Sequence, residues 1–521
     1  MHAWQHFVVF LLQSRILIFL RFGFGFIFFS YLFTAIGIAE RHKRVASIRK
    51  NFIYASIYKV LELALPLITS PILSRRLGAE SLGIYSYSYA IAALFTLVAE
   101  LGSYRYGMRE ISKARLSNKK LNQTYSDIYF THAVNGVIVT IVYFLMIPFF
   151  WGQHPLVYIL QSLCIISNAL DNSFLYVGVE EMKPLTIRDT CVKIATFVLI
   201  VAVIHKPNDL IAYIVIMNVC SIVCKFVALI YARKFVHFVF PNLLNCLNHY
   251  KHMIILMVPA VSENLYQNVG KLLIGVFGTK TSVGYYELST KATIPKNIVS
   301  TLGTVMCPNI ARLFSEGKKE DAIRKFKRSL QISMVASYFA AFGIASVAPE
   351  FAPWFWGEGF DVCAPLMTGL AFTIPVWTVG EVIRNQYLLP TGKDNQYMSA
   401  FLIGVFANIV GCSILIPFVG AMGAVLSMIF AELIMSIVQT FYIRKEVSIF
   451  HSLSATFPYL IFASIMMLAT RAFSYIVSLP LTFKVLLEFT VAFFVFATLC
   501  LIYEKTLPNK KIILSAINLV K

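Results

Sequence analysis

The stretch SENLYQNVGKLLIGVFG, residues 262–278, combines an apolar run with a set of polar side chains. It continues a hydrophobic segment that starts near Met253, so it predicts a membrane-spanning helix. At 100° per residue the polar side chains fall on one face of this helix, and leucine and valine occupy the other. A polar face at membrane depth indicates contact with water or protein rather than lipid. The polar residues are Glu263, Asn264, Gln267, Asn268 and Lys271.

The composition places the whole chain in a membrane. It has 521 residues, of which 58% are hydrophobic and only 13% are charged. A soluble protein of this length carries about a quarter charged residues. Apolar stretches of spanning length recur along the chain, and they must be helical because lipid cannot satisfy free backbone groups. We therefore predict an all-α, polytopic membrane protein.

Hydrophobic segments separated by short polar links predict about fourteen spans after residue 47. The links on one side are rich in Lys and Arg: residues 105–120 hold six bases against one acid, and 312–328 hold seven against three. This bias predicts that the basic loops and the C-terminus lie in the cytoplasm. The expected spans are 51–76, 82–104, 126–150, 154–179, 184–205, 208–233, 252–277, 282–308, 327–349, 361–391, 396–417, 420–444, 453–475 and 480–504.

The formal net charge of +20 follows largely from these loops, so it predicts no nucleic-acid partner. The basic loops would also attract anionic membrane lipids. The nine cysteines lie mostly inside predicted helices at no regular spacing, and His249 and His252 have no carboxylate or thiol near them in sequence. We therefore expect neither disulfides nor a metal site.

The two halves of the chain resemble each other at an offset of about 200 residues. RRLGAESLGIY (75–85) parallels GVFGTKTSVGYY (275–286), and EISKARLSNKK (110–120) parallels NIARLFSEGKK (309–319). Each half then holds six helices in the same orientation. Parallel repeats of this kind predict two pseudo-symmetric lobes related by an axis along the membrane normal, with a site between them. The last two spans stand outside the duplication.

These observations predict five regions. Residues 1–47 form a hydrophobic and basic N-terminal extension. This extension is an additional span, a segment at the membrane interface, or sequence upstream of the true start of translation. The N-lobe, the basic cytoplasmic linker, the C-lobe and the final pair of spans with a basic tail follow. Their expected ranges are 48–235, 236–251, 252–446 and 447–521.

Charged side chains recur inside four of the predicted spans. A charge at mid-bilayer costs about 2.5–3.5 kcal/mol on insertion scales, so these faces should line a hydrated cavity or fasten helices together as ion pairs. Their slight cationic surplus, with many amides and hydroxyls, favours an anionic, heavily hydroxylated ligand. The charged residues are Lys59 and Glu62 in the first span, Glu263 and Lys271 in the seventh, Glu287, Lys291 and Lys296 in the eighth, and Glu381 and Arg384 in the tenth.

Other conspicuous residues favour structural roles. The tyrosines of YSYSY (85–89), together with Trp354 and Trp356, are more typical of membrane-interface anchors than of sugar contacts. Glu100, Arg105 and Asp127 lie near cytoplasmic span ends and are expected to be solvated. Three prolines inside spans are candidates either for bends that let helices rock or for static kinks. They are Pro66, Pro295 and Pro375.

Four motifs carry a resemblance to a known family: LGAESLGIYSYSYA, GYYELSTKATIP, FWGEGF and YLLPTGKDNQY. Together, over residues 48–510, they resemble the polysaccharide transporters of the multidrug/oligosaccharidyl-lipid/polysaccharide exporter superfamily, and especially the Wzx-type flippases. The family often has an acid directly before the base of the seventh helix, whereas this chain has Gly270 before Lys271.

The resemblance implies a two-lobed, alternating-access bundle in the bacterial cytoplasmic membrane. It implies export of undecaprenyl-pyrophosphate-linked oligosaccharide for O-antigen, capsule or exopolysaccharide, with a polysaccharide polymerase and a chain-length regulator as candidate partners. No cofactor and no enzymatic activity are expected. Candidate substrate-binding residues are Lys59, Lys271, Lys291, Lys296, Arg384, Asn264, Gln267 and Asn268, and candidate counter-ion or coupling residues are Glu62, Glu263, Glu287 and Glu381.

Three other functions remain alternatives. An exporter of drugs or organic cations from the same superfamily would need an acidic surplus in the cavity. A flippase for lipid II or a teichoic-acid precursor would need the same diphosphate chemistry. A membrane polysaccharide polymerase would need a substantial outer loop, whereas the longest outer link is PEFAPWFWGEGFD (349–361).

Overall fold

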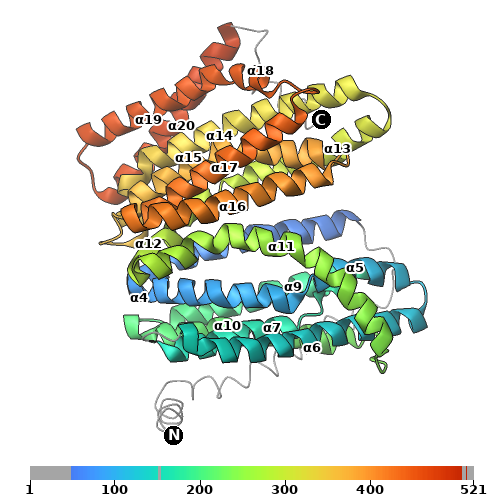
Figure 1. Cartoon of the computed structure of the whole chain (residues 1–521). Helices are drawn as coiled ribbons and strands as arrows, with labels where there is room; N and C mark the ends of the chain where they lie inside the picture. The colour runs from blue at the N-terminus through green and yellow to red at the C-terminus, as the bar shows by residue number, and fades with distance from the viewer. Residues whose placement is uncertain (1–47, 151–153, 507–511, 513–521) are drawn as a thin grey trace. The chain divides into compact units, whose positions relative to one another are not determined.

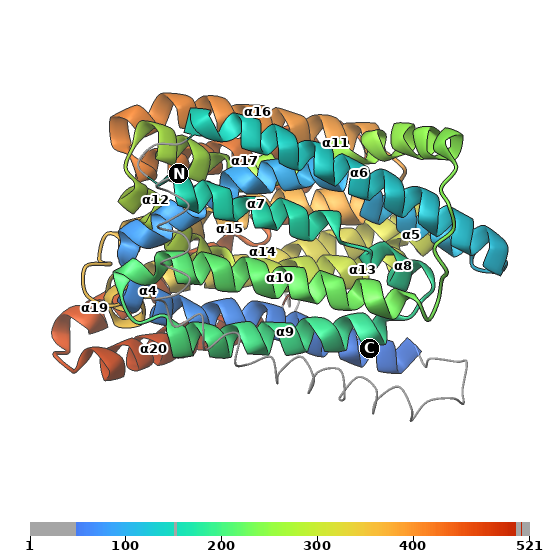
Figure 2. The same ribbon diagram turned by 90° about the horizontal axis from the view of Figure 1, so that it is seen from below.

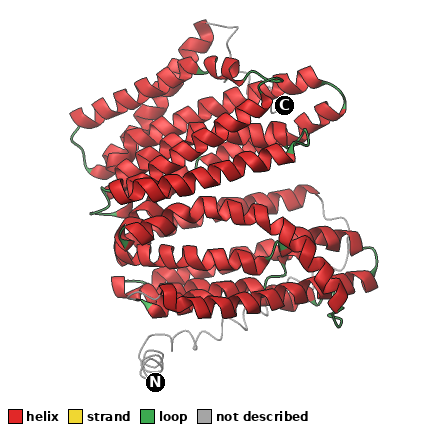
Figure 3. Cartoon of the chain, viewed as in Figure 1, coloured by secondary structure: helices red, strands yellow, loops and turns green. Residues whose placement is uncertain are grey.

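The computed structural model describes residues 48–150, 154–506 and 512, so the predicted N-terminal extension 1–47 lies outside it. Within the described residues all regular structure is helical, as Figure 3 shows. The residues from Tyr58 onward belong to one compact unit.

The N-terminal half consists of long helices that pack side by side (Figure 1). Helix α10 packs against α7 on one side and α9 on the other, an arrangement also visible in Figure 2. The helices of this half are α4 (Ile48–Glu100), α5 (Ser103–Ala114), α6 (Asn118–Phe150), α7 (Pro155–Ala169), α8 (Ser173–Gly178), α9 (Met182–Val203), η1 (Pro207–Asp209) and α10 (Leu210–Ala232).

The C-terminal half contains the remaining helices. Helix α11 packs against α16 and α17 of this half and also against α5 and α6 of the other, so it joins the two. The helices are α11 (Leu243–Phe277), α12 (Lys280–Ser289), η2 (Thr290–Thr293), α13 (Lys296–Ser315), α14 (Lys319–Trp356), α15 (Cys363–Ile383), η3 (Arg384–Leu388), α16 (Asp394–Val419), α17 (Ala421–Ile443), α18 (Ile449–Ser454), α19 (Phe457–Ile476) and α20 (Leu481–Thr506).

Nine helices in the described part of the chain are long and apolar enough to cross a membrane. Several other predicted spans coincide with helices that are interrupted or carry polar side chains. The span predicted at 282–308 divides into α12, η2 and α13, with Pro295 at the last junction. The span predicted at 361–391 ends in the single π-helical turn η3. The count of fourteen therefore stays a prediction.

Glycines allow α4 and α12 to approach closely. Helix α4 kinks at Gly78, whose φ of 76° favours glycine. Beyond the kink, a Cβ on Gly83 would stand 1.6 Å from the carbonyl oxygen of Lys280, and one on Gly284 would stand 2.0 Å from that of Ala79. Because Gly83 and Gly284 occupy matching places in the sequence repeat, the duplicated motif forms a reciprocal contact between the halves.

A hydrophobic core also joins the halves at this end. It contains Leu77 and Leu82 of α4, Leu288 of α12 and Trp356 of α14. Trp356 is only 1% exposed, and its Nε1 donates a hydrogen bond of 2.8 Å to Ser70 Oγ. The expectation that Trp356 anchors the chain at the membrane interface was therefore wrong, because this indole is sealed between helices.

Asp127 also differs from expectation. It is 1% exposed rather than solvated, and its carboxylate accepts hydrogen bonds from the Asn242 backbone and the Asn245 side chain. Asn242 caps the N-terminus of α11 through the backbone N–H groups of Leu244 and Asn245. Helix α11 therefore begins inside the segment 236–251 that was predicted to be a linker.

Candidate functional site

The first part of the candidate site is a carboxylate shared by two lysines. Lys271 Nζ of α11 lies 2.6 Å from Glu287 Oε2 of α12, and Lys291 Nζ of η2 lies 3.0 Å from Glu287 Oε1. The three side chains are 18–27% exposed, although Glu287 Oε2 itself is buried. We call these three residues the Glu287 group. The group brings together three predicted site residues from the seventh and eighth predicted spans.

The second part is formed where α15 passes into the π-helical turn η3. Arg384 Nη2 lies 2.8 Å from Glu381 Oε2, while Asn385 and Ser300 donate hydrogen bonds of 2.6 and 3.2 Å to Glu381 Oε1. A π-turn places an extra residue in the helix and re-aims the side chains around it. Both predicted residues of the tenth span, Glu381 and Arg384, thus pair with each other.

Lys296 lies at the start of α13, beside a carboxylate that the sequence analysis missed. Its Nζ lies 3.9 Å from Glu432 Oε1 of α17 and 5.4 Å from the centre of the Trp377 ring. Glu432 has no charged neighbour on its own helix, so a search for paired charges passes over it. A lone acid in the apolar run MIFAELIMS (428–436) was nevertheless a signal, because an ionisable residue inside a span is a candidate functional residue.

The polar face of α11 divides into open and buried parts. Glu263 and Gln267 are exposed, and Glu263 pairs with no cation among the described residues. Asn268 is buried and donates hydrogen bonds to the side chain and backbone oxygens of Asn264. In this arrangement Glu263 therefore does not hold Lys271, which pairs with Glu287 instead. Lys59 and Glu62 lie in α4, and their side chains fall outside the described residues.

The paired groups carry a small positive excess. Four basic side chains, Lys271, Lys291, Lys296 and Arg384, face three carboxylates, Glu287, Glu381 and Glu432. These pairs therefore leave one cation in surplus, while Glu263 stays exposed outside them. Their arrangement suits an anionic ligand that competes with the carboxylates for the lysines.

Tyrosines of the N-terminal half face the Glu287 group. Tyr85 and Tyr89 of α4 both lie within electrostatic range of Glu287. Their rings stack with centroids 5.8 Å apart, and Tyr85 also meets Tyr213 edge to face at 4.8 Å. The Glu287 group therefore lies where residues of both halves of the chain come together.

The N-terminal half has ion pairs of its own, which the sequence analysis also missed. Lys225 Nζ of α10 lies 2.6 Å from Asp171 Oδ2, and Ser173 donates two hydrogen bonds to Asp171 Oδ1. Arg188 and Asp189 of α9 pair at 2.6 Å. Asp171 lies in the break between α7 and α8, a segment that was predicted to be one continuous span. In the described residues no three His, Cys, Asp or Glu side chains gather as metal ligands.

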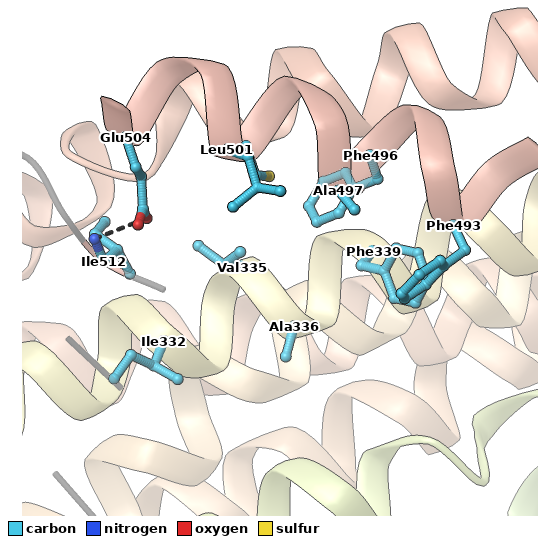
Figure 4. A pocket seen from close by; sticks show the side chains of 11 residues that line it. Ile332, Val335, Ala336, Phe339, Phe493, Phe496, Ala497, Leu501, Glu504 and Ile512 are labelled. Carbon is cyan, nitrogen blue, oxygen red and sulfur yellow. Dashed lines mark hydrogen bonds between the residues drawn. The ribbon is translucent and has the colours of Figure 1, made fainter. Parts of the chain in front are cut away.

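An apolar pocket of about 400 Å³ lies between α14 and α20 (Figure 4). Val335 and Phe339 of α14 face Phe493 and Phe496 of α20 across it. At one end Glu504 Oε1 accepts a hydrogen bond of 2.9 Å from the Ile512 backbone. Among the described residues its lining is apolar apart from Glu504 and holds no cation, so the pocket is unsuited to a diphosphate or a sugar. It contains none of the predicted site residues.

Comparison with solved structures defines the class of fold. The lipid II flippase MurJ in an inward closed conformation superposes with a TM-score of 0.71 at 14% identity, over 88% of this chain and 99% of that one. An inward-facing MATE family transporter of the MOP superfamily superposes with a TM-score of 0.54 at 11% identity, over 76% and 97%. The chain is thus a multi-pass membrane protein with the fold of these transporters.

Sequence comparison gives the family. Residues 48–314 match the family model described as polysaccharide biosynthesis protein, and the chain belongs to this family. It is 20% identical over 399 residues to a protein of Shigella dysenteriae described as an O-antigen transporter, covering 74% of this chain and 97% of that one. A protein of Escherichia coli strain K12 with the same description is 19% identical, over 77% and 97%.

Proposed function

We propose that this chain is a flippase that moves a polyprenyl-diphosphate-linked oligosaccharide across a membrane for surface polysaccharide synthesis. The observation that carries the proposal is the Glu287 group, a partly exposed carboxylate that holds two lysines where the halves meet. The family membership and the relatives described as O-antigen transporters support the same substrate class. The expected carrier lipid is undecaprenyl pyrophosphate.

Diphosphate binding is an exchange of partners in this proposal. The diphosphate oxygens replace the Glu287 carboxylate as acceptors for Lys271 and Lys291, with Lys296 and Arg384 as further contacts. Charge-assisted hydrogen bonds of this kind are worth about 1.5–3 kcal/mol each. Asn264 and Gln267 of α11 would hydrogen-bond sugar hydroxyls, with the buried Asn268 orienting Asn264. The polyprenyl tail would stay in lipid between the lobes.

The direction of transport follows from the proposed orientation. We place the protein in the bacterial inner membrane. Its basic loops and its C-terminus then lie in the cytoplasm. The reciprocal contact of Gly83 and Gly284 then lies toward the outer face, so this structure corresponds to a state closed on that side. A membrane potential negative inside favours outward movement of anionic charge by about 2.3 kcal/mol per charge per 100 mV.

The charge balance favours this substrate over an organic cation. A cation exporter needs a carboxylate surplus, whereas four bases face three acids in the paired groups. Lipid II and teichoic-acid precursors share the diphosphate, so they differ from the proposed substrate only in the sugar. A polysaccharide polymerase and a chain-length regulator are the proposed partners in the pathway.

The test is export by the Lys271→Gln variant in a strain that lacks the chromosomal gene. Glu287 keeps Lys291 in this variant, so the protein should reach the membrane at its normal level while surface polysaccharide falls about tenfold or more. Lys393→Gln is the matched control, because Lys393 pairs with Glu446 outside the candidate site. Normal export by Lys271→Gln would remove Lys271 from the site and contradict the proposal.

A further inference from the structure

Glu432 is the most isolated carboxyl group of the candidate site. Its side chain is 0% exposed, and neither carboxylate oxygen has a hydrogen-bond partner among the described residues. The cation beside it is Lys296, whose Nζ at 3.9 Å is too distant for a hydrogen bond. An ionised carboxylate held dry with one loose partner is costly. Lys296 is therefore the main group that keeps Glu432 charged.

Lys296 is the nearest cation to Glu432 among the described residues, and Arg384 is a second cation close enough to interact with it electrostatically. Arg384 Nη2 is bonded to Glu381. The buried Tyr266 hydroxyl approaches the Glu432 carboxylate and favours its charged form, although the contact lacks the geometry of a full hydrogen bond. The titratable groups that face this region from the packed helices are Tyr266 of α11, Tyr286 of α12, Lys296 of α13, Glu381 of α15, Arg384 of η3 and Cys412 of α16.

A second carboxyl group shows what distinguishes Glu432. Glu488 of α20 is also 0% exposed, and both of its oxygens lack hydrogen-bond partners among the described residues. Its surroundings are Glu350, Arg471 and Lys484, none of which belongs to the candidate site. Of these two isolated carboxyl groups, Glu432 is the one whose cation belongs to the proposed diphosphate site. Movement of Lys296 toward a bound diphosphate therefore changes the electrostatic surroundings of Glu432 and not those of Glu488.

We propose that Glu432 is a proton-binding site linked to the substrate through Lys296, an inference that rests on the proposed function. When Lys296 turns to the diphosphate, Glu432 loses its cation and one carboxylate oxygen takes a proton from water. An O–H bond forms, and the carboxylate charge of −1 becomes zero. When the diphosphate leaves, Lys296 returns and the proton is released to water. The proton thus offsets one negative charge of the bound diphosphate.

The experiment is titration calorimetry of farnesyl pyrophosphate, a soluble polyprenyl diphosphate, into the purified full-length protein in lipid nanodiscs. Repeating it in buffers with different ionisation enthalpies gives the number of protons taken up per ligand. Measurement near pH 8 keeps the ligand fully ionised. Wild type should take up about one proton more than Glu432→Gln, and Lys296→Gln should match Glu432→Gln because its Glu432 is already protonated.

Glu488→Gln is the matched control, since it neutralises an equally buried carboxyl away from the site, and it should take up the same number of protons as wild type. Equal proton uptake by wild type and Glu432→Gln would overturn the assignment of Glu432 while leaving the proposed function standing. Failure of wild type to bind farnesyl pyrophosphate would instead overturn both. Membrane level and thermal stability of Glu432→Gln establish that the variant folds.

Discussion

The two halves of the chain hold their buried charges in different ways. In the N-terminal half, Asp171 uses both oxygens: one pairs with Lys225 at 2.6 Å, and the other accepts two hydrogen bonds from Ser173. In the C-terminal half, one carboxylate, Glu287, serves two lysines, and Glu432 has no hydrogen bond among the described residues. The halves share a sequence repeat but not a charge arrangement.

This difference separates structural charges from charges available to a ligand. An ion pair whose carboxylate oxygens all have partners, as in Asp171 with Lys225, mainly holds helices together and gives up its cation less readily. The pair of Glu381 with Arg384 in the C-terminal half is of the same kind.

A carboxylate that pairs with two cations, such as Glu287, can release one of them to a competing anion. A carboxylate whose cation lies beyond hydrogen-bond distance, such as Glu432, can also lose that cation to the anion. We infer that the C-terminal half binds the diphosphate and that the N-terminal half supplies the opposing wall, including Tyr85 and Tyr89.

The largest effect is expected when the Glu287 group is replaced as a whole. The variant Lys271→Gln, Glu287→Gln, Lys291→Gln removes two cations and one anion and leaves no unpaired charge. Two charge-assisted contacts to diphosphate are lost, worth about 3–6 kcal/mol together, so export should fall more than 100-fold at normal membrane level. Surface polysaccharide per cell measures the result. Export within tenfold of wild type would contradict the claim that the Glu287 group binds the diphosphate.

The next effect concerns folding in the N-terminal half. Lys225→Gln leaves Asp171, whose side chain is 22% exposed, without its cation. A fully buried pair would lose about 3–5 kcal/mol, and partial exposure lowers the cost to about 1–3 kcal/mol, so the amount of protein in the membrane should fall. The double variant Asp171→Asn, Lys225→Gln removes both charges, and both its membrane level and its export should recover. Quantitative blotting and surface polysaccharide measure the two. A well-folded double variant that does not export would assign this pair to transport.

A smaller effect is expected at the glycine contact between the halves. Gly83→Ala places a Cβ where the Lys280 carbonyl oxygen stands, so the halves must separate at this end and export should fall about tenfold. Gly343→Ala is the control, because its new Cβ would meet only Met466 Cε at 3.8 Å. If Gly83→Ala exported like Gly343→Ala, close approach of the two helices would not be part of the transport cycle.

The smallest effect is a pH dependence outside the membrane spans. Hydrogen bonds from Lys393 and Tyr387 lower the pKa of Glu446 to about 2. A carboxyl group with a lowered pKa in the folded state stabilises the protein above its unfolded pKa, near 4.5, and loses that contribution as the pH falls toward 2. Wild type should therefore melt slightly above Glu446→Gln at pH 7, and the difference in melting temperature should shrink below about pH 4.5 and vanish near pH 2. If the difference in melting temperature did not change with pH, the ionisation of Glu446 would not be the cause of the pH dependence.

The sequence predicted the helical membrane fold and two ion pairs of the candidate site, because these depend on local patterns. Lys291 follows Glu287 by one helical turn, and Arg384 follows Glu381 by three residues, so both pairs are visible in sequence. The contact from Lys271 to Glu287 joins two helices, which spacing alone does not give.

Other features depended on tertiary packing. Glu432 and its cation, Lys296, lie on different helices, so each looks isolated in the sequence. Asp171 lies in a helix break that hydrophobicity does not reveal. Trp356 lies near a span end like an interface anchor, but the packing of α4 against α14 buries it. In each case the missing information was which helices are neighbours.

The most direct test of the central claim is binding of undecaprenyl pyrophosphate to the purified full-length protein in nanodiscs, with undecaprenol as the uncharged reference. Wild type and the Asp171→Asn, Lys225→Gln variant should bind the diphosphate with equal affinity. The Lys271→Gln, Glu287→Gln, Lys291→Gln variant should bind it at least 100-fold more weakly and undecaprenol no differently. Equal affinity for the diphosphate in all three proteins would contradict the claim that the C-terminal half binds it.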